Sequence, residues 1–209
     1  MAFDVSLGTT FPIDVGPRLS LEIPGRILFQ FELGWLPGGY ADAVVGLVEA
    51  FGTDNAILGP AIEDALGDSV VVRAGGGWRP FSAAGFELYA GYTYIGVGGT
   101  ATPDVVASLV DDELGDQIEA QFDGPLGVGA QLHSLHLGLG WRFLAFDDHL
   151  VIRAQVGYLQ TLAASATLDI PEDRDLQNSA EPLFDAALTE VVTRDVKLPL
   201  FGLSAGYRF

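Results

Sequence analysis

Eight segments of the chain alternate apolar residues with polar or small ones, and this period of two is the strongest constraint on the fold. In the clearest segment, 26–35, Ile27, Phe29 and Phe31 alternate with residues that include Gln30 and Glu32. A period of two predicts a β-strand whose two faces differ. The same alternation predicts strands at 3–11, 19–23, 26–35, 70–78, 86–94, 135–141, 150–158 and 201–209.

Charged side chains and glycines share one face of these predicted strands. The charged positions are Asp4, Glu22, Arg26, Glu32, Arg73, Arg79, Glu87, Arg142, Arg153 and Arg208. Alternation alone also fits a soluble barrel with an apolar interior. The glycines favour the opposite orientation, because they suit the crowded interior of a narrow barrel; they are Gly8, Gly34, Gly75, Gly77, Gly91, Gly138, Gly140, Gly157, Gly202 and Gly206. We therefore expect polar residues inside and apolar residues facing lipid.

The acidic residues gather in three long stretches between the predicted strands. Residues 37–68, 98–127 and 164–192 contain 20 of the 28 acidic residues and one basic residue, Arg174. Short links alternate with these stretches, so all the long loops lie at one end of the barrel, as extracellular loops do. The sequence thus predicts a single all-β domain over 1–209, an eight-stranded antiparallel up-and-down transmembrane barrel with three long extracellular loops.

The composition excludes several other classes of protein. A mean hydropathy of +0.32 rules out an unfolded polyanion despite the net charge of −18. No run of about 18 apolar residues is present, which excludes helical membrane spans. The chain has no cysteine, so it has no disulfide, thiolate metal site or cysteine nucleophile. The negative charge disfavours nucleic acid as a partner.

Outward aromatic residues form two predicted belts where the barrel would meet the membrane surfaces. The principal members are Trp78 and Trp141 near the short turns, with Trp35, Tyr92, Tyr94 and Tyr158 near the long loops.

The C-terminal strand resembles that of outer-membrane β-barrels of Gram-negative bacteria, in particular the small eight-stranded group typified by OmpA and OmpX. The family ends in an aromatic residue with a second aromatic two positions earlier, and Phe209 and Tyr207 match. The resemblance implies that the barrel-assembly machinery reads these two residues and inserts the chain into the outer membrane. Because residues 1–4 have neither a basic start nor an apolar run, we expect either that a secretory signal was removed and Met1 restored, or that the numbering begins at an expressed fragment.

Inward charged residues are expected to form a polar network in the lumen. Its predicted members are Glu22, Arg26, Glu32, Arg73, Glu87, His136, Arg142 and Arg153. Such a network serves either as an ion path or gated pore, or as a polar plug that fills the barrel. An eight-stranded barrel has room for little beyond side chains, which favours the plug.

The sequence at 133–136 is the one place that allows a catalytic interpretation. Ser134 and His136 share a face, as a nucleophile and its base would. The small outer-membrane lipases that use histidine and serine on a strand present them toward the membrane, whereas here both face inward. No third catalytic residue is identifiable, so we predict no enzymatic activity, no cofactor and no metal site.

The long loops carry helical patterns. Apolar residues at helical spacing follow Tyr40, Pro60 and Pro103, and Ser179 is a candidate N-cap for a further helix. These helices either pack together as a lid over the barrel or present their apolar faces to a partner or to lipid. The run 111–113 is acidic, but it lacks the spacing of a calcium loop and indicates a solvated face.

Together these features predict a monomeric, non-enzymatic outer-membrane protein with a structural, adhesive or surface-interaction role through its acidic cap. The alternative is a narrow channel or conduit for a small apolar ligand, and a lipid-modifying enzyme is less favoured still. The expected partners are outer-membrane lipid, the barrel-assembly machinery, and divalent cations held weakly by the acidic loops.

Overall fold

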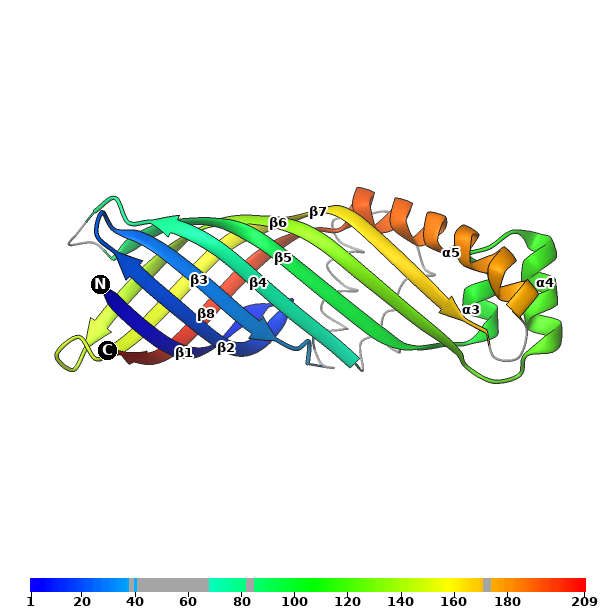
Figure 1. The fold of residues 1–209 in the computed structure, drawn as a ribbon, viewed down its shortest axis with the longest axis horizontal. Helices are drawn as coiled ribbons and strands as arrows, with labels where there is room; N and C mark the ends of the chain where they lie inside the picture. Colours follow the sequence, from blue (N-terminus) through cyan, green and yellow to red (C-terminus); the bar gives the residue numbers. More distant parts are fainter. Residues whose placement is uncertain (38–39, 41–67, 82–84, 171–173) are drawn as a thin grey trace.

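Eight antiparallel strands close into a barrel in the computed structural model, which describes residues 1–37, 40, 68–81, 85–170 and 174–209 (Figure 1). Each strand pairs with its neighbours in sequence, and β1 pairs with β8 to close the sheet. The strands are β1 (Ala2–Phe11), β2 (Asp14–Ile23), β3 (Ile27–Gly34), β4 (Asp68–Trp78), β5 (Phe86–Ala101), β6 (Leu126–Ala145), β7 (Leu150–Asp169) and β8 (Lys197–Arg208). The predicted fold class is confirmed.

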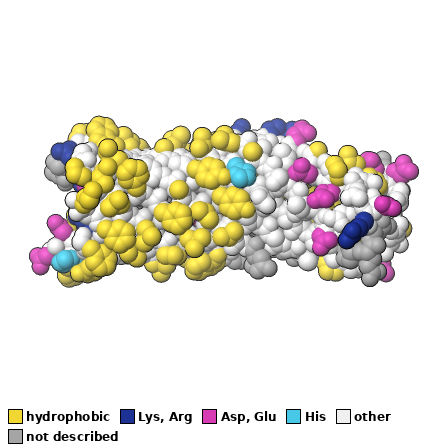
Figure 2. Space-filling view, viewed as in Figure 1, with side chains coloured by type: hydrophobic (Ala, Val, Ile, Leu, Met, Phe, Trp, Pro, Cys, Tyr) yellow, Lys and Arg dark blue, Asp and Glu magenta, His cyan; other side chains and the backbone are white. Residues whose placement is uncertain are grey.

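The barrel is polar inside and apolar outside. Along β1 and β2 buried and exposed residues alternate, and the buried members include Asp4, Ser6, Arg18 and Ser20. Leucine, phenylalanine and tryptophan side chains are exposed instead; Leu137, for example, is 62% exposed. Figure 2 shows these apolar side chains gathered over the half of the barrel that holds the termini, whereas most acidic side chains lie at the other end.

The strands β5, β6 and β7 are much longer than predicted. The predicted loops 98–127 and 164–192 begin or end within them, because β5 continues to Ala101, β6 begins at Leu126 and β7 continues to Asp169. The outward apolar run of β6, from Phe143 to Leu135, rises by roughly 20 Å at a tilt of about 40°. The remaining residues of β6 extend the sheet by roughly 23 Å beyond the membrane-facing band.

A register shift lies at the level where this extension starts. Between His133 and Ser134 the pairing of β6 with β7 shifts, so that Ser134 pairs with Thr161 and His133 with Ala163. Leu162 is the extra residue of a bulge, and the buried positions of β7 change from Leu159 and Thr161 to later even-numbered residues. The alternation of inward and outward side chains therefore continues along the folded strand, but in the sequence the inward positions change from odd to even residue numbers at Leu162.

In the described part of the chain, two helices lie at the end of the extended strands and a third runs along β7 (Figure 1). They are α3 (Pro103–Ala107), α4 (Asp112–Gln121) and α5 (Arg174–Asp195). Their apolar faces share one buried cluster with β5, β6 and β7, which includes Val106, Ile118, Leu126, Leu168 and Phe184. We call this assembly of 102–125 and 170–196 the cap. None of the helices that the structure describes is both long and apolar enough to cross a membrane.

The pairing of β7 with β8 ends at Gln160, so the edge of β7 beyond this residue has no neighbouring strand from β8. Helix α5 packs along this edge. The Ala166 N–H donates to Asp185 Oδ1 at 2.6 Å, and Thr189 Oγ1 donates to the Ala164 carbonyl at 3.2 Å. Side chains of α5 thus take the place of the missing strand and cover an edge that would otherwise invite pairing.

The helix predictions are correct in part. A helix begins at Pro103 as expected, but a second starts at Asp112, and Asp111 caps it by accepting the Leu114 N–H at 2.9 Å. The prediction that Ser179 caps a helix is wrong. Ser179 lies inside α5, where its hydroxyl donates to the Asp175 carbonyl at 3.0 Å. The patterns after Tyr40 and Pro60 fall outside the described residues.

Candidate functional site

The lumen nearest the chain termini is filled by ion pairs around Arg153. This guanidinium is fully buried and donates to both carboxylate oxygens of Asp4, at 2.6 and 2.7 Å. Its Nε also lies 3.5 Å from Glu87 Oε2, and Glu87 lies 3.7 Å from Arg142 Nε. Two-point pairing of this kind fixes the geometry of both side chains.

Glu22 joins three arginines at the same end of the barrel. Its Oε2 accepts from Arg142 Nη1 at 2.8 Å and lies 3.8 Å from Arg208 Nη2, while Oε1 pairs with Arg79. Positions Asp4, Glu22 and Glu87 thus face Arg79, Arg142, Arg153 and Arg208 in one connected group of buried and partly buried charges.

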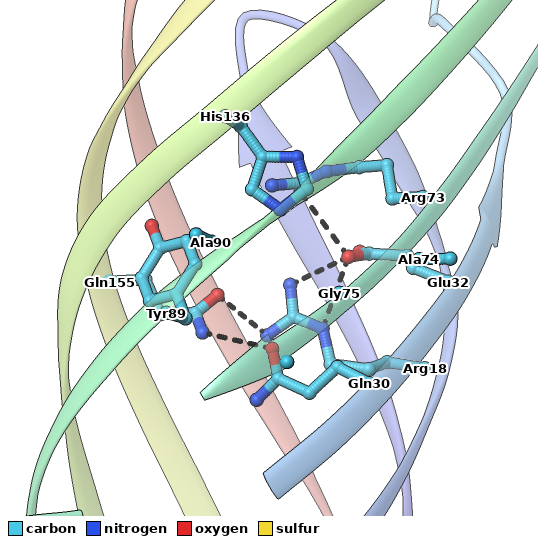
Figure 3. Close-up of a pocket in the computed structure, with 11 residues that line it drawn as sticks. Arg18, Gln30, Glu32, Arg73, Ala74, Gly75, Tyr89, Ala90, His136 and Gln155 are labelled. Atoms are coloured by element: carbon cyan, nitrogen blue, oxygen red, sulfur yellow. Dashed lines mark hydrogen bonds and ion pairs between the residues drawn. The ribbon is translucent and has the colours of Figure 1, made fainter. Parts of the chain in front are cut away.

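A second charged group crosses the middle of the lumen (Figure 3). Glu32 Oε2 accepts from Arg18 Nη2 at 2.8 Å and from Arg73 Nη1 at 3.3 Å. Arg18 also donates to Gln155 Oε1 at 2.9 Å, and Arg73 donates to Thr10 Oγ1 at 2.7 Å. Five strands therefore contribute to one hydrogen-bonded layer across the barrel.

One cavity in this layer has room for about one water molecule. The cavity lined by Arg18, Glu32, Arg73, His136 and Gln155 has a volume of about 20 Å³. Glycines allow the rest of the cross-section to be filled. A Cβ at Gly138 or Gly157 would lie 2.3 or 2.7 Å from the Tyr89 hydroxyl, so this ring occupies room that side chains would take.

An apolar layer closes the lumen toward the cap. Ile13, Val71, Leu159 and Leu200 are buried against one another, and Ile95 packs against them. Along the described part of the lumen, this apolar layer therefore follows the two charged groups on the side of the cap.

Seven of the eight predicted network residues lie in the lumen, and Arg26 does not. The seven are Glu22, Glu32, Arg73, Glu87, His136, Arg142 and Arg153. Arg26 is exposed in the β2–β3 turn at φ 63°, and its Nη1 donates to the Pro80 carbonyl at 2.9 Å. The prediction for Arg26 is wrong because the tight turn includes this residue, so that β3 starts at Ile27, one residue later than predicted.

Sequence reasoning did not place Arg18 or Asp14 in the network. Both are buried on β2, and Arg18 is a centre of the middle layer. The signal is present, because position 18 continues the inward parity of Ser20 and Glu22, but the predicted strand begins only at residue 19. Asp4, which has the inward parity, proves to be the main partner of Arg153.

Ser134 and His136 face inward, as predicted, but they do not form a catalytic pair. The Ser134 hydroxyl lies 3.2 Å from Thr161 Oγ1, and His136 Nδ1 lies 2.8 Å from Thr93 Oγ1. Within the described part of the chain, each side chain is hydrogen-bonded to a threonine and not to the other.

The predicted belt residues face outward. Trp78 and Trp141 lie toward the short turns, while Trp35, Tyr92, Tyr94 and Tyr158 lie toward the cap. Tyr92 hydrogen-bonds His133 Nδ1 on this outer face, and the Tyr94 ring is 5.5 Å from His133. At the other end, the rings of Tyr207 and Phe209 are in contact at 4.9 Å, and the Phe209 N–H donates to the Phe3 carbonyl at 2.8 Å.

The acidic side chains of the cap that the structure describes are mostly exposed. Residues 102–125 and 170–196 contain fourteen acidic and two basic residues. Asp111 and Glu113 are exposed, and a hydrogen bond from Thr102 lowers the pKa of Asp104. Among the described residues, no group of three potential metal ligands comes together.

Two solved outer-membrane barrels resemble the structure. The major outer membrane protein of Thermus thermophilus shares 13% identity and a TM-score of 0.52, over 100% of this chain and 98% of that one. The N-terminal β-barrel domain of Pseudomonas aeruginosa OprF shares 8% identity and a TM-score of 0.43, over 100% and 96% of the two chains. No protein-family model and no curated protein matches the chain.

Fold and surface together define the class of protein. A closed barrel leaves no unpaired strand edge within the membrane-facing band, and its exposed apolar outer face is stable only in lipid. The match to the Thermus thermophilus barrel shows the same fold. The chain is an integral outer-membrane β-barrel protein.

Proposed function

We propose that the protein is a non-conducting membrane anchor that presents its acidic cap at the cell surface for interaction with charged partners. The observation that carries this proposal is the filled lumen, in which two ion-pair groups and an apolar layer succeed one another along the barrel. A barrel that conducts needs a connected polar path, and an apolar layer interrupts it.

The cap has the organisation of a displayed domain. Strands β5, β6 and β7 carry it beyond the membrane-facing band, and its own buried cluster of Val106, Ile118, Leu126 and Phe184 supports it. The helices therefore use their apolar faces for internal packing, which leaves their acidic faces as the surface available to a partner.

The charge of the cap defines the chemistry of that partner. Fourteen acidic against two basic residues produce a negative field that attracts cations and basic surfaces and repels anions. Divalent ions at the surface are expected to bind weakly and at many positions, with an effect that falls as salt shortens the Debye length to about 10 Å at 0.1 M.

Planar-bilayer recording tests whether the barrel is an anchor or a channel. Folded protein, identified because it runs faster on gels unheated than boiled, is inserted into planar bilayers. The membranes are collected after the recording to verify that they contain folded protein. The proposal expects no stable conductance above the lipid background. Steady currents from folded wild-type protein would reject it in favour of the narrow channel.

The conduit for an apolar ligand receives less support. A conduit requires an apolar cavity that runs from the cap into the lumen, whereas the apolar side chains of Ile13, Val71, Leu159 and Leu200 pack against one another in the described part of the barrel.

A further inference from the structure

A groove runs across the outer face of the sheet directly above the membrane-facing band. Its volume is about 290 Å³, and its lining crosses β4, β5, β6 and β7. That volume is close to the lower end of small-molecule sites, at about 300 Å³, so the groove suits a small chemical group and not a folded protein.

The height of the groove follows from the outward residues of each strand. On β5, Tyr94 belongs to the aromatic belt and Gly96, two residues on, is in the groove. On β6, His133 contacts the belt residues Tyr92 and Tyr94, and Gln131, the next outward residue, lines the groove. The groove thus begins one outward position above the belt, where lipid headgroups lie.

Glycines form the floor of the groove and leave room for two hydroxyl groups directly above it. A Cβ at Gly96 would lie 3.1 Å from the Tyr94 hydroxyl, and a Cβ at Gly129 would lie 2.7 Å from Thr167 Oγ1. Side chains at these two positions would therefore displace the tyrosine and threonine. Because glycine has no side chain, both hydroxyls lie close to the surface of the sheet within the groove.

The polar side chains of the groove are uncharged and have no hydrogen bond to another group that the structure describes. Gln131, Ser165 and Thr167 are exposed, and neither they nor the Tyr94 hydroxyl have a hydrogen bond to another described group. No lysine, arginine or carboxylate is among the described lining residues. A phosphate headgroup would therefore find no opposite charge, whereas a neutral headgroup with several hydroxyls would find donors and acceptors.

We infer that this groove binds the sugar headgroup of a neutral glycolipid in the leaflet next to the cap. The C–H face of a sugar ring packs on the Tyr94 ring, and its hydroxyls hydrogen-bond Gln131, Ser165 and Thr167. The occupant is a lipid because the lower edge of the groove is continuous with the lipid-facing belt residues Tyr92 and Tyr94 and with His133, which contacts both. Its acyl chains then follow the barrel surface below.

Native mass spectrometry of the full-length protein tests the inference. The protein in detergent is titrated with digalactosyldiacylglycerol or with phosphatidylglycerol of the same acyl chains. We expect the glycolipid to bind about tenfold more tightly, equivalent to a difference of ~1.4 kcal/mol. Equal binding of the two lipids would overturn the inference, because the acyl chains alone would then explain retention.

Matched variants locate the site. The triple variant Gln131→Leu, Ser165→Ala, Thr167→Val removes the hydrogen-bonding groups without changing charge and should abolish the preference. Gln160→Leu makes the same glutamine change on the outward face of β7, outside the groove, and should retain the preference. Loss in both variants, or in neither, would overturn the assignment. Unheated gel mobility verifies that each variant is folded.

Binding of a soluble sugar distinguishes a free sugar from a glycolipid headgroup as the occupant of the groove. Free digalactose should bind at least about a hundredfold more weakly than the glycolipid, because it lacks the acyl chains that hold the headgroup at the groove. Equal affinity for the free sugar would contradict a membrane lipid as the occupant.

Discussion

Replacing Arg153 by methionine removes the cation at the centre of the lumen group near the termini. The guanidinium is fully buried and donates to Asp4 at 2.6 and 2.7 Å, with Glu87 at 3.5 Å. Without it, two buried carboxylates lose their main counter-charge. Breaking a buried ion pair by removing one partner costs about 3–5 kcal/mol, so Arg153→Met should lower the free energy of unfolding by ~4 kcal/mol.

Urea unfolding from phosphatidylcholine vesicles measures this loss, with fluorescence from the outward-facing tryptophans as the signal. At a urea dependence of about 2 kcal/mol per molar, the midpoint should fall by ~2 M. The control is Arg194→Met, which removes an exposed cation that lies 3.7 Å from Glu190 on α5. Exposed pairs contribute about 0–1 kcal/mol, so its midpoint should fall by less than ~0.5 M.

A second variant separates buried charge from lost packing. Asp4→Leu combined with Arg153→Met removes both members of the pair, while Glu87 keeps its contact with Arg142 at 3.7 Å. The double variant should therefore be more stable than Arg153→Met alone. If Arg153→Met falls no further than Arg194→Met, then the lumen charges are solvated and the account of a filled lumen is wrong.

Three further predictions concern assembly, the cap and its charge. Deleting Phe209 should reduce insertion in cells but leave the urea midpoint of refolded protein within ~0.5 M, because its role is recognition during assembly; unchanged insertion would argue against that role. Asp185→Ala removes the acceptor of the Ala166 N–H and should raise hydrogen exchange at Ala166 by a factor equivalent to about 1–3 kcal/mol, whereas Asp175→Ala should not; equal exchange in both would refute the edge contact. Mg²⁺ should raise the protease resistance of the cap gradually and less at high salt, and a saturable response indifferent to salt would instead indicate a dedicated site.

The strand count and the inward face could be predicted because lipid imposes one rule on every membrane-facing residue. Glu32 and Arg73 share the inward parity of their strands, and the structure pairs them at 3.3 Å. The odd or even position of a residue in its strand shows whether its side chain faces the lumen or the lipid, but not at which height along the barrel axis it lies. It therefore could not show that Arg18 completes this pair or that Asp4, and not Glu22, is the main partner of Arg153.

The prediction failed where the lipid rule no longer applies. Beyond Tyr94 the outward residues of β5 are glycines and a threonine, so the alternation that reveals a strand in lipid disappears although the strand continues to Ala101. In β7 the bulge at Leu162 reverses the parity, which hides the inward face formed by Ala166 and Leu168. The length of α5 depends on its contacts with this face, and short-range capping signals such as Ser179 do not reveal it.

The sidedness of the barrel tests the central claim that it spans the outer membrane with the acidic cap outside. The chain has no cysteine, so single cysteines can be introduced without background. Asp123→Cys lies in the exposed connection between α4 and β6, and Pro24→Cys lies in the exposed β2–β3 turn at the opposite end. A membrane-impermeant maleimide should label Asp123→Cys on intact cells and label Pro24→Cys only after the outer membrane is permeabilised. Labelling of Pro24→Cys on intact cells while Asp123→Cys stays protected would contradict the account.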